Sequence, residues 1–192
     1  MKENLIEKHK SQQESIYISY GKFAIQFEHL CKALRENILF ALIKYGLTEQ
    51  TITRILLADL TAYALVSKCR SIISFMYSDN PEGVKHIDPI FKACITIIEK
   101  RNLIIHGNWM IPMICDENTK NGVRYDIATG LKEKIIKTGI KTEVNKFNEN
   151  DFNELTEKIK IAQNLISNIE YCYQFNKDLQ SISKSKIDEL YN

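Results

Sequence analysis

Two residues near the middle of the chain have side chains that together could cleave a phosphodiester. Arg101 carries a planar, permanently charged guanidinium that suits phosphate, and His106 can accept or release a proton near neutral pH. Cleavage of RNA by transesterification needs a base for the ribose 2′-hydroxyl, an acid for the leaving 5′-oxygen and a cation for the phosphorane. The pair therefore predicts RNA cleavage that needs no metal and no other cofactor.

The two side chains can reach one site if they lie at the end of a helix. At 100° per residue, Asn102 and His106 lie about 40° apart, whereas Arg101 and His106 lie roughly 140° apart. The long arginine side chain can still enter the same cleft from its edge. A helix C-terminus favours a protonated imidazole, which suits His106 as an acid. Because the reaction needs two proton carriers, either a symmetric dimer supplies the second or one histidine acts twice.

The Arg–His spacing also has a non-catalytic explanation. Such a pair can arise by chance, and a histidine near a helix end often only satisfies the last carbonyls. Three neighbouring residues favour a functional role. Asn102 interrupts an apolar helical face, Gly107 ends the helix and leaves its backbone open to a ligand, and Trp109 could stack a base. A lone tryptophan is also a common core residue, so both roles for Trp109 stay open.

Apolar residues at helical spacing predict four amphipathic helices, which would pack as an all-α, up-and-down bundle of four to five helices. The first stripe consists of Phe23, Phe27, Leu30, Leu34, Ile38, Ala41 and Tyr45, and Gly46 stops it. The second, capped by Thr48 or Thr51, consists of Ala58, Ala62, Leu65, Cys69, Ile72 and Met76. The third, opened by Asp88-Pro89, consists of Phe91, Ile95, Ile98, Asn102 and Ile105. The fourth, capped by Asn148 or Asn150, consists of Phe152, Leu155, Ile159, Ala162, Ile166, Ile169 and Tyr173.

These helices belong to a single predicted domain over residues 1–192, with core helices at about 14–106 and 148–175. The polar residues 1–13 are expected to fray. The polar residues 176–192 would either extend the last helix or hang loose.

An insert at about residues 108–147 is expected to hold a small β-hairpin or irregular structure, with Asn121-Gly122 as a hairpin turn. Five lysines gather in this insert, at positions 132, 134, 137, 141 and 146. They would either guide RNA toward the cleft or form an ordinary solvated face.

Composition limits the classes of protein to consider. A net charge of +2, from 26 basic and 24 acidic residues, is unlike a duplex DNA binder but leaves room for a locally basic cleft. The five cysteines form no CxxC pair, so neither a disulfide framework nor a zinc site is expected. The N-terminus has no apolar signal core, and no run approaches the ~20 apolar residues of a membrane span. These features predict a reduced, cytoplasmic protein that does not enter a membrane.

Arg101-Asn102-x-x-x-His106 resembles the RNxxxH (R-x4-6-H) signature of the HEPN superfamily. The likeness includes the Asn after the Arg, the Gly after the His and the place of the motif at the end of the third predicted helix. It implies a HEPN-like fold and a metal-independent endoribonuclease that acts on single-stranded RNA as a homodimer and leaves 2′,3′-cyclic phosphate ends. Such proteins act as toxins, antiviral defence effectors or RNA-processing enzymes.

The resemblance also implies a role for each motif residue within one composite cleft of the dimer. Arg101 would bind and polarise the scissile phosphate, His106 would be the general acid or base, and Asn102 would orient the phosphate or the histidine. In the HEPN toxins that a nucleotidyltransferase antitoxin controls, the motif continues as H-x-Tyr and that tyrosine is modified. Asn108 stands at this position here, which argues against an antitoxin of that kind and leaves another antitoxin or defence protein as a partner.

The alternative is a non-catalytic helical module that binds a nucleotide, RNA or a protein. Enclosure of Arg101 and His106 within one chain would favour the module, and a cleft shared by two chains would favour the nuclease. Asp59, which stands among apolar residues, is either a buried partner of this pair or an exposed residue.

Overall fold

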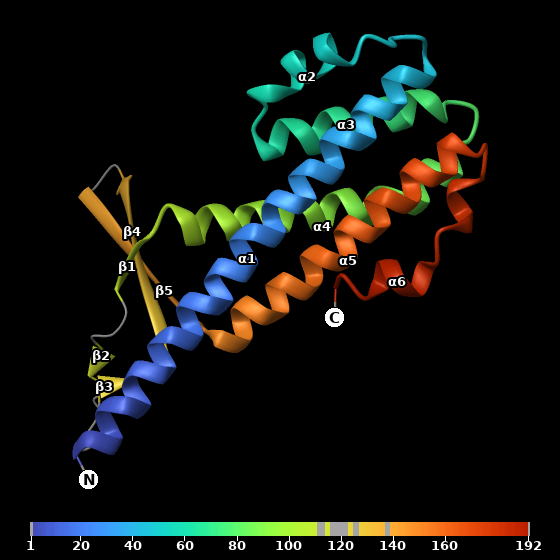
Figure 1. The fold of residues 1–192 in the computed structure, drawn as a ribbon. Coiled ribbons are helices and arrows are strands. Elements are labelled where there is room, and N and C mark those ends of the chain that lie inside the picture. Colours follow the sequence, from blue (N-terminus) through green and yellow to red (C-terminus); the bar gives the residue numbers. More distant parts are fainter. Residues whose placement is uncertain (1, 111–113, 116–122, 125–126, 137–138, 192) are drawn as a thin grey trace. The chain divides into compact units, whose positions relative to one another are not determined.

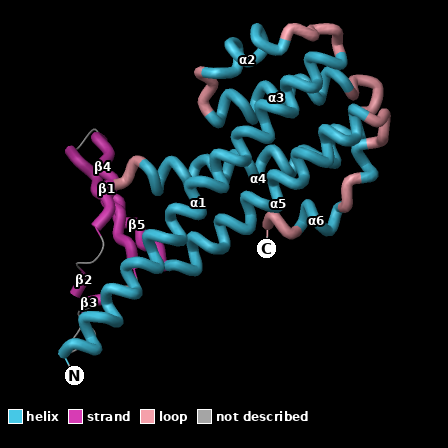
Figure 2. The backbone as a smooth tube through the Cα atoms, viewed as in Figure 1, coloured by secondary structure: helices cyan, strands magenta, loops and turns pink. Residues whose placement is uncertain are grey.

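The computed structural model describes residues 2–110, 114–115, 123–124, 127–136 and 139–191. Most of these residues are helical, and the strands between the fourth and fifth helices are few and antiparallel (Figure 1, Figure 2). The predicted mainly α-helical class with a small β insert is therefore confirmed. None of the helices in the described part has the length and apolar character needed to cross a bilayer.

The elements follow one another in the order shown in Figure 1. The described helices are α1 (Lys2–Lys44), α2 (Gln50–Ala58), α3 (Ala62–Met76), α4 (Pro81–Ile105), α5 (Glu149–Gln174), the 3₁₀ helix η1 (Leu179–Ser181) and α6 (Lys184–Asp188). The described strands are β1 (Asn108–Met110), β2 (Ile114–Cys115), β3 (Val123–Arg124), β4 (Ile127–Ile136) and β5 (Gly139–Asn148).

The chain divides into two compact units, each made of two segments. The first unit holds residues 1–25 and 100–156, and the second holds 26–99 and 157–192. Each unit has its own core, and the RNxxxH motif belongs to the first. That residues 1–192 form a single domain remains a prediction.

In the second unit, α1 and α5 run in the same direction and are tied by polar contacts. Gln26 donates to Gln163 over 2.6 Å, and further along both helices Lys44 donates to the carbonyl of Tyr173. Between them, the buried Asn37 amide donates to the Ile166 carbonyl over 2.9 Å. The apolar stripes predicted for these two helices are buried as expected, except that Tyr45 is exposed.

Helix α3 also runs in the direction of α1, because α2 carries the chain back between them. The Cys69 thiol donates to the Asn37 amide oxygen over 3.5 Å. Further along both helices, the ring of Phe75 lies 5.5 Å from that of Tyr45. Four of the cysteines, Cys31, Cys69, Cys94 and Cys172, are buried. They fill the core as small apolar side chains.

The single helix predicted across residues 51–76 is wrong, because the chain ends one helix and caps another there. Asp59 is the exposed C-cap of α2, and Thr61 caps α3 by accepting a hydrogen bond from the Ala64 N–H over 3.3 Å. The predicted caps Thr48 and Thr51 are also wrong. Glu49 takes that place, since its carboxylate accepts from the Thr51 N–H over 2.9 Å.

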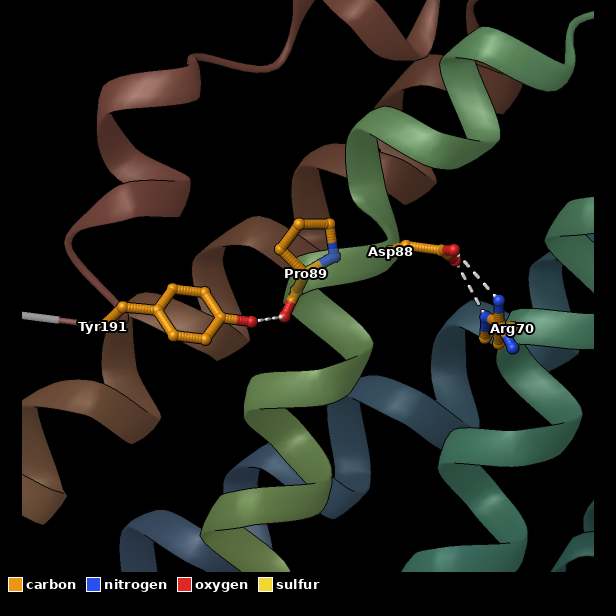
Figure 3. A network of polar contacts seen from close by, with 4 residues as sticks. All are labelled: Arg70, Asp88, Pro89 and Tyr191. Carbon is orange, nitrogen blue, oxygen red and sulfur yellow. Dashed lines mark hydrogen bonds and ion pairs between the residues drawn. The ribbon is translucent and has the colours of Figure 1, made fainter.

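Helix α4 begins at Pro81 and not at Asp88-Pro89 as predicted. Asn80 supplies the cap, since its side-chain oxygen accepts from the Gly83 N–H over 3.0 Å and Pro81 fills the first helical position. Pro89 lies inside the helix, and its carbonyl accepts a hydrogen bond from Tyr191 over 2.5 Å (Figure 3). Beside it, Asp88 pairs with Arg70 of α3.

The C-terminal residues fold back on the second unit and neither extend α5 nor hang loose. The chain turns at Asn176, which has a φ of 53°. Four apolar residues of η1, α6 and their flanks are buried, namely Leu179, Ile182, Ile187 and Leu190. Their burial provides the free energy that fixes the polar segment in place.

The first unit has an aromatic core where α1, the sheet and the start of α5 meet. Phe152 of α5 lies with its ring centroid 5.9 Å from Tyr20 and 6.1 Å from Phe23, both on α1. On the other side it lies 5.7 Å from Phe147 of β5, which in turn lies 5.5 Å from Trp109 of β1. Asn148 caps α5, as predicted, by accepting from the Asp151 N–H over 3.1 Å.

The sheet of the first unit has the strand order β1-β4-β5, with both pairings antiparallel. Strands β4 and β5 form a long hairpin whose register runs from Ile127↔Asn148 to Ile136↔Gly139. Strands β2 and β3 pair with each other, and the predicted turn Asn121-Gly122 lies outside the described residues. Helix α1 also departs from the prediction, because it includes residues 2–13.

Candidate active site

Helix α4 carries Arg101 on the line of its buried residues. Ile97, one turn before, and Ile104, almost one turn after, are both buried. Of the predicted stripe, Phe91 and Ile98 are buried as expected, but Ile95 is exposed and Ile105 is half-buried. The polar residue that interrupts the buried line is Arg101, and Asn102 lies beside this line.

Arg101 and Asn102 contact each other through their side chains. The guanidinium Nη1 of Arg101 donates to the Asn102 amide oxygen over 3.2 Å, and both residues are half-buried. The amide oxygen thus orients part of the guanidinium fork, and the amide N–H₂ of Asn102 keeps two donors for another acceptor. A fixed guanidinium beside an amide donor suits an oxyanion such as phosphate.

His106 follows directly after Ile105, the last residue of α4. Its backbone N–H donates to the Asn102 carbonyl over 3.1 Å, and the residue is exposed. The helix ends here as predicted, and the next residue, Gly107, has little room for a side chain. A Cβ at Gly107 would lie 3.1 Å from the Leu103 carbonyl oxygen and 3.2 Å from the Trp109 indole nitrogen.

Trp109 is bound to the end of α4 by its indole N–H, which donates to the Ile104 carbonyl. The ring also lies against Gly130 of β4, where an added Cβ would come within 2.8 Å of the indole. The residue is half-buried. Trp109 therefore has a packing role, which agrees with the prediction that it is a core residue. The rest of its ring lines a small pocket.

That pocket has a volume of about 180 Å³ and apolar walls. It is lined by Ile16, Tyr17, Tyr20, Trp109, Ala128 and Phe152. All six residues belong to the first unit, as do Arg101, Asn102 and His106. Apart from the aromatic type of Trp109, nothing in the sequence indicates this pocket, because its walls come from four separate segments.

Asp59 and the five lysines of the insert are the other candidates that the sequence offered. Asp59 is exposed, which matches one of its two predicted alternatives, and His29 on α1 is exposed as well. His86 bonds to the Ile182 carbonyl over 2.8 Å. Of the five insert lysines, Lys146 is exposed, and the side chains of the other four are not among those described.

A larger hollow of about 590 Å³, which the sequence did not indicate, lies in the second unit where helix ends meet. It is lined by Lys44, Tyr45, Met76, Tyr77, Asn80, Tyr173, Asn176, Lys177 and Asp178. Its polar groups bind one another: Lys44 donates to Asn176, and Asn80 donates to Asp178. Among the described residues, no group of three or more His, Cys, Asp or Glu side chains could hold a metal ion.

Comparison with protein-family models, with curated proteins and with solved structures finds no match to this chain. The resemblance to the HEPN superfamily therefore rests on the motif residues and on the helices that carry them.

Proposed function

We propose that this chain is a metal-independent endoribonuclease of HEPN type, whose helices form a HEPN-like bundle and which acts as a cytoplasmic homodimer. The observation that carries the proposal is the joint placement of three residues at one helix end. Arg101 and Asn102 are held together by a 3.2 Å hydrogen bond, and His106 follows one turn later at the surface. No cofactor is part of the proposal.

Each residue has a defined task in the proposed reaction. The guanidinium of Arg101 binds the scissile phosphate and stabilises the phosphorane. Asn102 orients the phosphate, and His106 transfers a proton as general acid or base. A second copy of the chain supplies the second histidine in a composite cleft. Exposure of His106 supports this arrangement, because an enclosed imidazole could not reach RNA or a partner chain.

The direct test is cleavage of single-stranded RNA in EDTA, with the product ends identified as 2′,3′-cyclic phosphates. Arg101→Ala and His106→Ala should each reduce the rate by at least about a hundredfold, because an electrostatic stabiliser and a proton-transfer group each contribute about that much or more. The matched controls are His29→Ala and Arg54→Ala, which remove exposed residues of the same types. Cleavage that persists in both motif variants would refute the proposal.

A non-catalytic helical module that binds a nucleotide, RNA or a protein is the second candidate. It is favoured by the position of Arg101 in line with the buried Ile97 and Ile104, which gives the arginine a packing role. In that case Arg101→Ala would lower the melting temperature, and no RNA would be cleaved by the unaltered chain.

A further inference from the structure

The first unit holds an aromatic pocket beside β1, the strand that follows the motif, and we propose that it binds one unpaired pyrimidine base of an RNA strand. The proposal deepens the proposed ribonuclease function and rests on it for the choice of ligand. Three properties of the pocket carry it: its size, its walls and its link to the end of α4.

The size of the pocket matches a single ring. Its volume of about 180 Å³ is below the roughly 300–1,000 Å³ of a site that encloses a whole small-molecule ligand. An apolar protein cavity of about 150 Å³ takes up benzene. The pocket therefore holds one six-membered ring, and the sugar and phosphate of the same nucleotide would stay outside.

The walls of the pocket are suited to a flat ring. Four of the six lining residues are aromatic, namely Tyr17, Tyr20, Trp109 and Phe152. Tyr17 is 59% exposed, so its ring stands at the mouth of the pocket. Bases of every type stack on aromatic side chains, whereas an aliphatic ligand would gain no stacking from them.

Small residues on β4 create the hollow. Ala128 and Gly130 alternate along the strand and so face the same side of the sheet. The indole of Trp109 fills the space over Gly130, and the space next to Ala128 stays open between the indole and α1. The pocket is thus a built feature of the sheet surface and not a gap between loosely packed loops.

The pocket is linked to the motif by a short, fixed connection. Trp109, which forms one wall, stands three residues after His106 and donates its indole N–H to the Ile104 carbonyl at the end of α4. A base held against this wall would keep the neighbouring phosphates close to the end of α4. The pocket would in this way position the strand for Arg101 and His106.

The chain contains a single tryptophan, so its fluorescence reports directly on the pocket. The experiment uses the full-length His106→Ala variant, which keeps the RNA intact, and titrates it with octauridine, octaadenosine and an abasic octamer. Binding is followed both by fluorescence anisotropy of the end-labelled RNA and by Trp109 emission. The expected result is a change of Trp109 emission with octauridine, at lower concentrations than with octaadenosine and not with the abasic strand.

Two variants locate the binding site. Tyr17→Ala removes an exposed wall, and Ala128→Leu fills the hollow; each should weaken octauridine binding about five- to hundredfold, the range for loss of one base stack. Tyr171→Ala is the control, because Tyr171 is 53% exposed on α5 in the other unit. Circular dichroism melting shows whether each variant is folded. If Ala128→Leu does not fold, Tyr17→Ala alone tests the pocket.

Four other outcomes overturn the proposal. RNA that binds without a change in Trp109 emission, equal binding of the abasic strand or of octaadenosine, or no RNA binding at all excludes a pyrimidine in the pocket. A change in Trp109 emission with protein concentration alone identifies a second copy of the chain as the occupant. If octauridine fills the pocket but the unaltered chain cleaves no RNA, the proposed nuclease fails and the base pocket stands.

Discussion

The indole ring of Trp109 lies against the backbone of Gly130, so closely that a Cβ at position 130 would come within 2.8 Å of the ring. Gly130→Ala should therefore lower the free energy of unfolding by about 1–3 kcal/mol, because the ring must move out of a packed position. Urea denaturation followed by Trp109 emission measures the change. The control is Gly21→Ala in α1, where a Cβ meets nothing within 4 Å and should stabilise the helix by up to about 1 kcal/mol.

The buried amide of Asn37 should be intolerant of a negative charge. Asn37 is fully buried, its side-chain N–H₂ donates to the Ile166 carbonyl over 2.9 Å, and its backbone carbonyl accepts from the Tyr173 hydroxyl over 2.8 Å. Asn37→Asp should cost about 3 kcal/mol or more at pH 7, because a carboxylate cannot donate and its charge is buried without a partner. The loss should shrink as pH falls, since a protonated carboxyl can donate again. Equal melting temperatures for the two proteins at pH 7 would contradict this account.

The buried thiol of Cys94 predicts a loss of stability at alkaline pH. Burial raises the pKa of this thiol to about 12 in the folded chain, while in the unfolded chain it is about 8.5. The stabilisation is fully present below pH 8.5 and is lost as pH rises from there toward 12, because the unfolded chain releases its proton first. Between pH 9 and 11, Cys94→Ala should reduce the decrease of the unfolding free energy with pH by up to about 1.4 kcal/mol per pH unit. Ser67→Ala, at an exposed site, should leave the slope unchanged.

The ion pair of Arg70 and Asp88 in Figure 3 should contribute little to stability in spite of its good geometry. The two nitrogen–oxygen distances are 2.9 and 3.0 Å, but the side chains are 52% and 25% exposed. A double-mutant cycle with Arg70→Ala and Asp88→Ala should give a coupling of about 0.2–1 kcal/mol that decreases in 1 M salt. A coupling of several kcal/mol would mean that water screens the pair far less than its exposure implies.

The composite site can be tested by mixing inactive variants. If the proposed dimer places Arg101 of one copy near His106 of the other and one histidine acts twice, a mixture of Arg101→Ala and His106→Ala chains should recover part of the RNA cleavage, because mixed dimers hold one intact arginine and one intact histidine. The recovery should peak at equal amounts of the two variants. A mixture as inactive as its components would mean either that the complete site lies within one chain or that the cleft needs the histidines of both copies. Sedimentation of each variant provides the control for dimer formation.

The amino-acid sequence determined the features that depend on local chemistry. The apolar stripes of α1 and α5, the stop at Gly46 and the cap at Asn148 could be read directly, because side-chain periodicity and capping involve residues within a few positions of one another. The same locality explains why the end of α4 near Gly107 could be placed.

Tertiary structure decided the features for which the sequence offers equivalent choices. Pro81 and Pro89 could each open a helix, and the choice of Pro81 follows from the Asn80 cap and the burial of Ile87 and Ile90 on either side of Pro89. The rotation of α4 that puts Arg101, and not Asn102, on the buried line was decided in the same way, since a stripe of isoleucines fits several faces.

The aromatic pocket was beyond the reach of sequence reasoning. Its walls come from residues 16–20, 109, 128 and 152, whose distance in the sequence carries no sign of their contact in space. Only packing of the sheet against α1 and α5 brings these residues together, because the hydrophobic effect rewards burial of any apolar neighbour and is not directional. The motif could be found by its spacing, whereas the surface that would present RNA to it exists only in the folded chain.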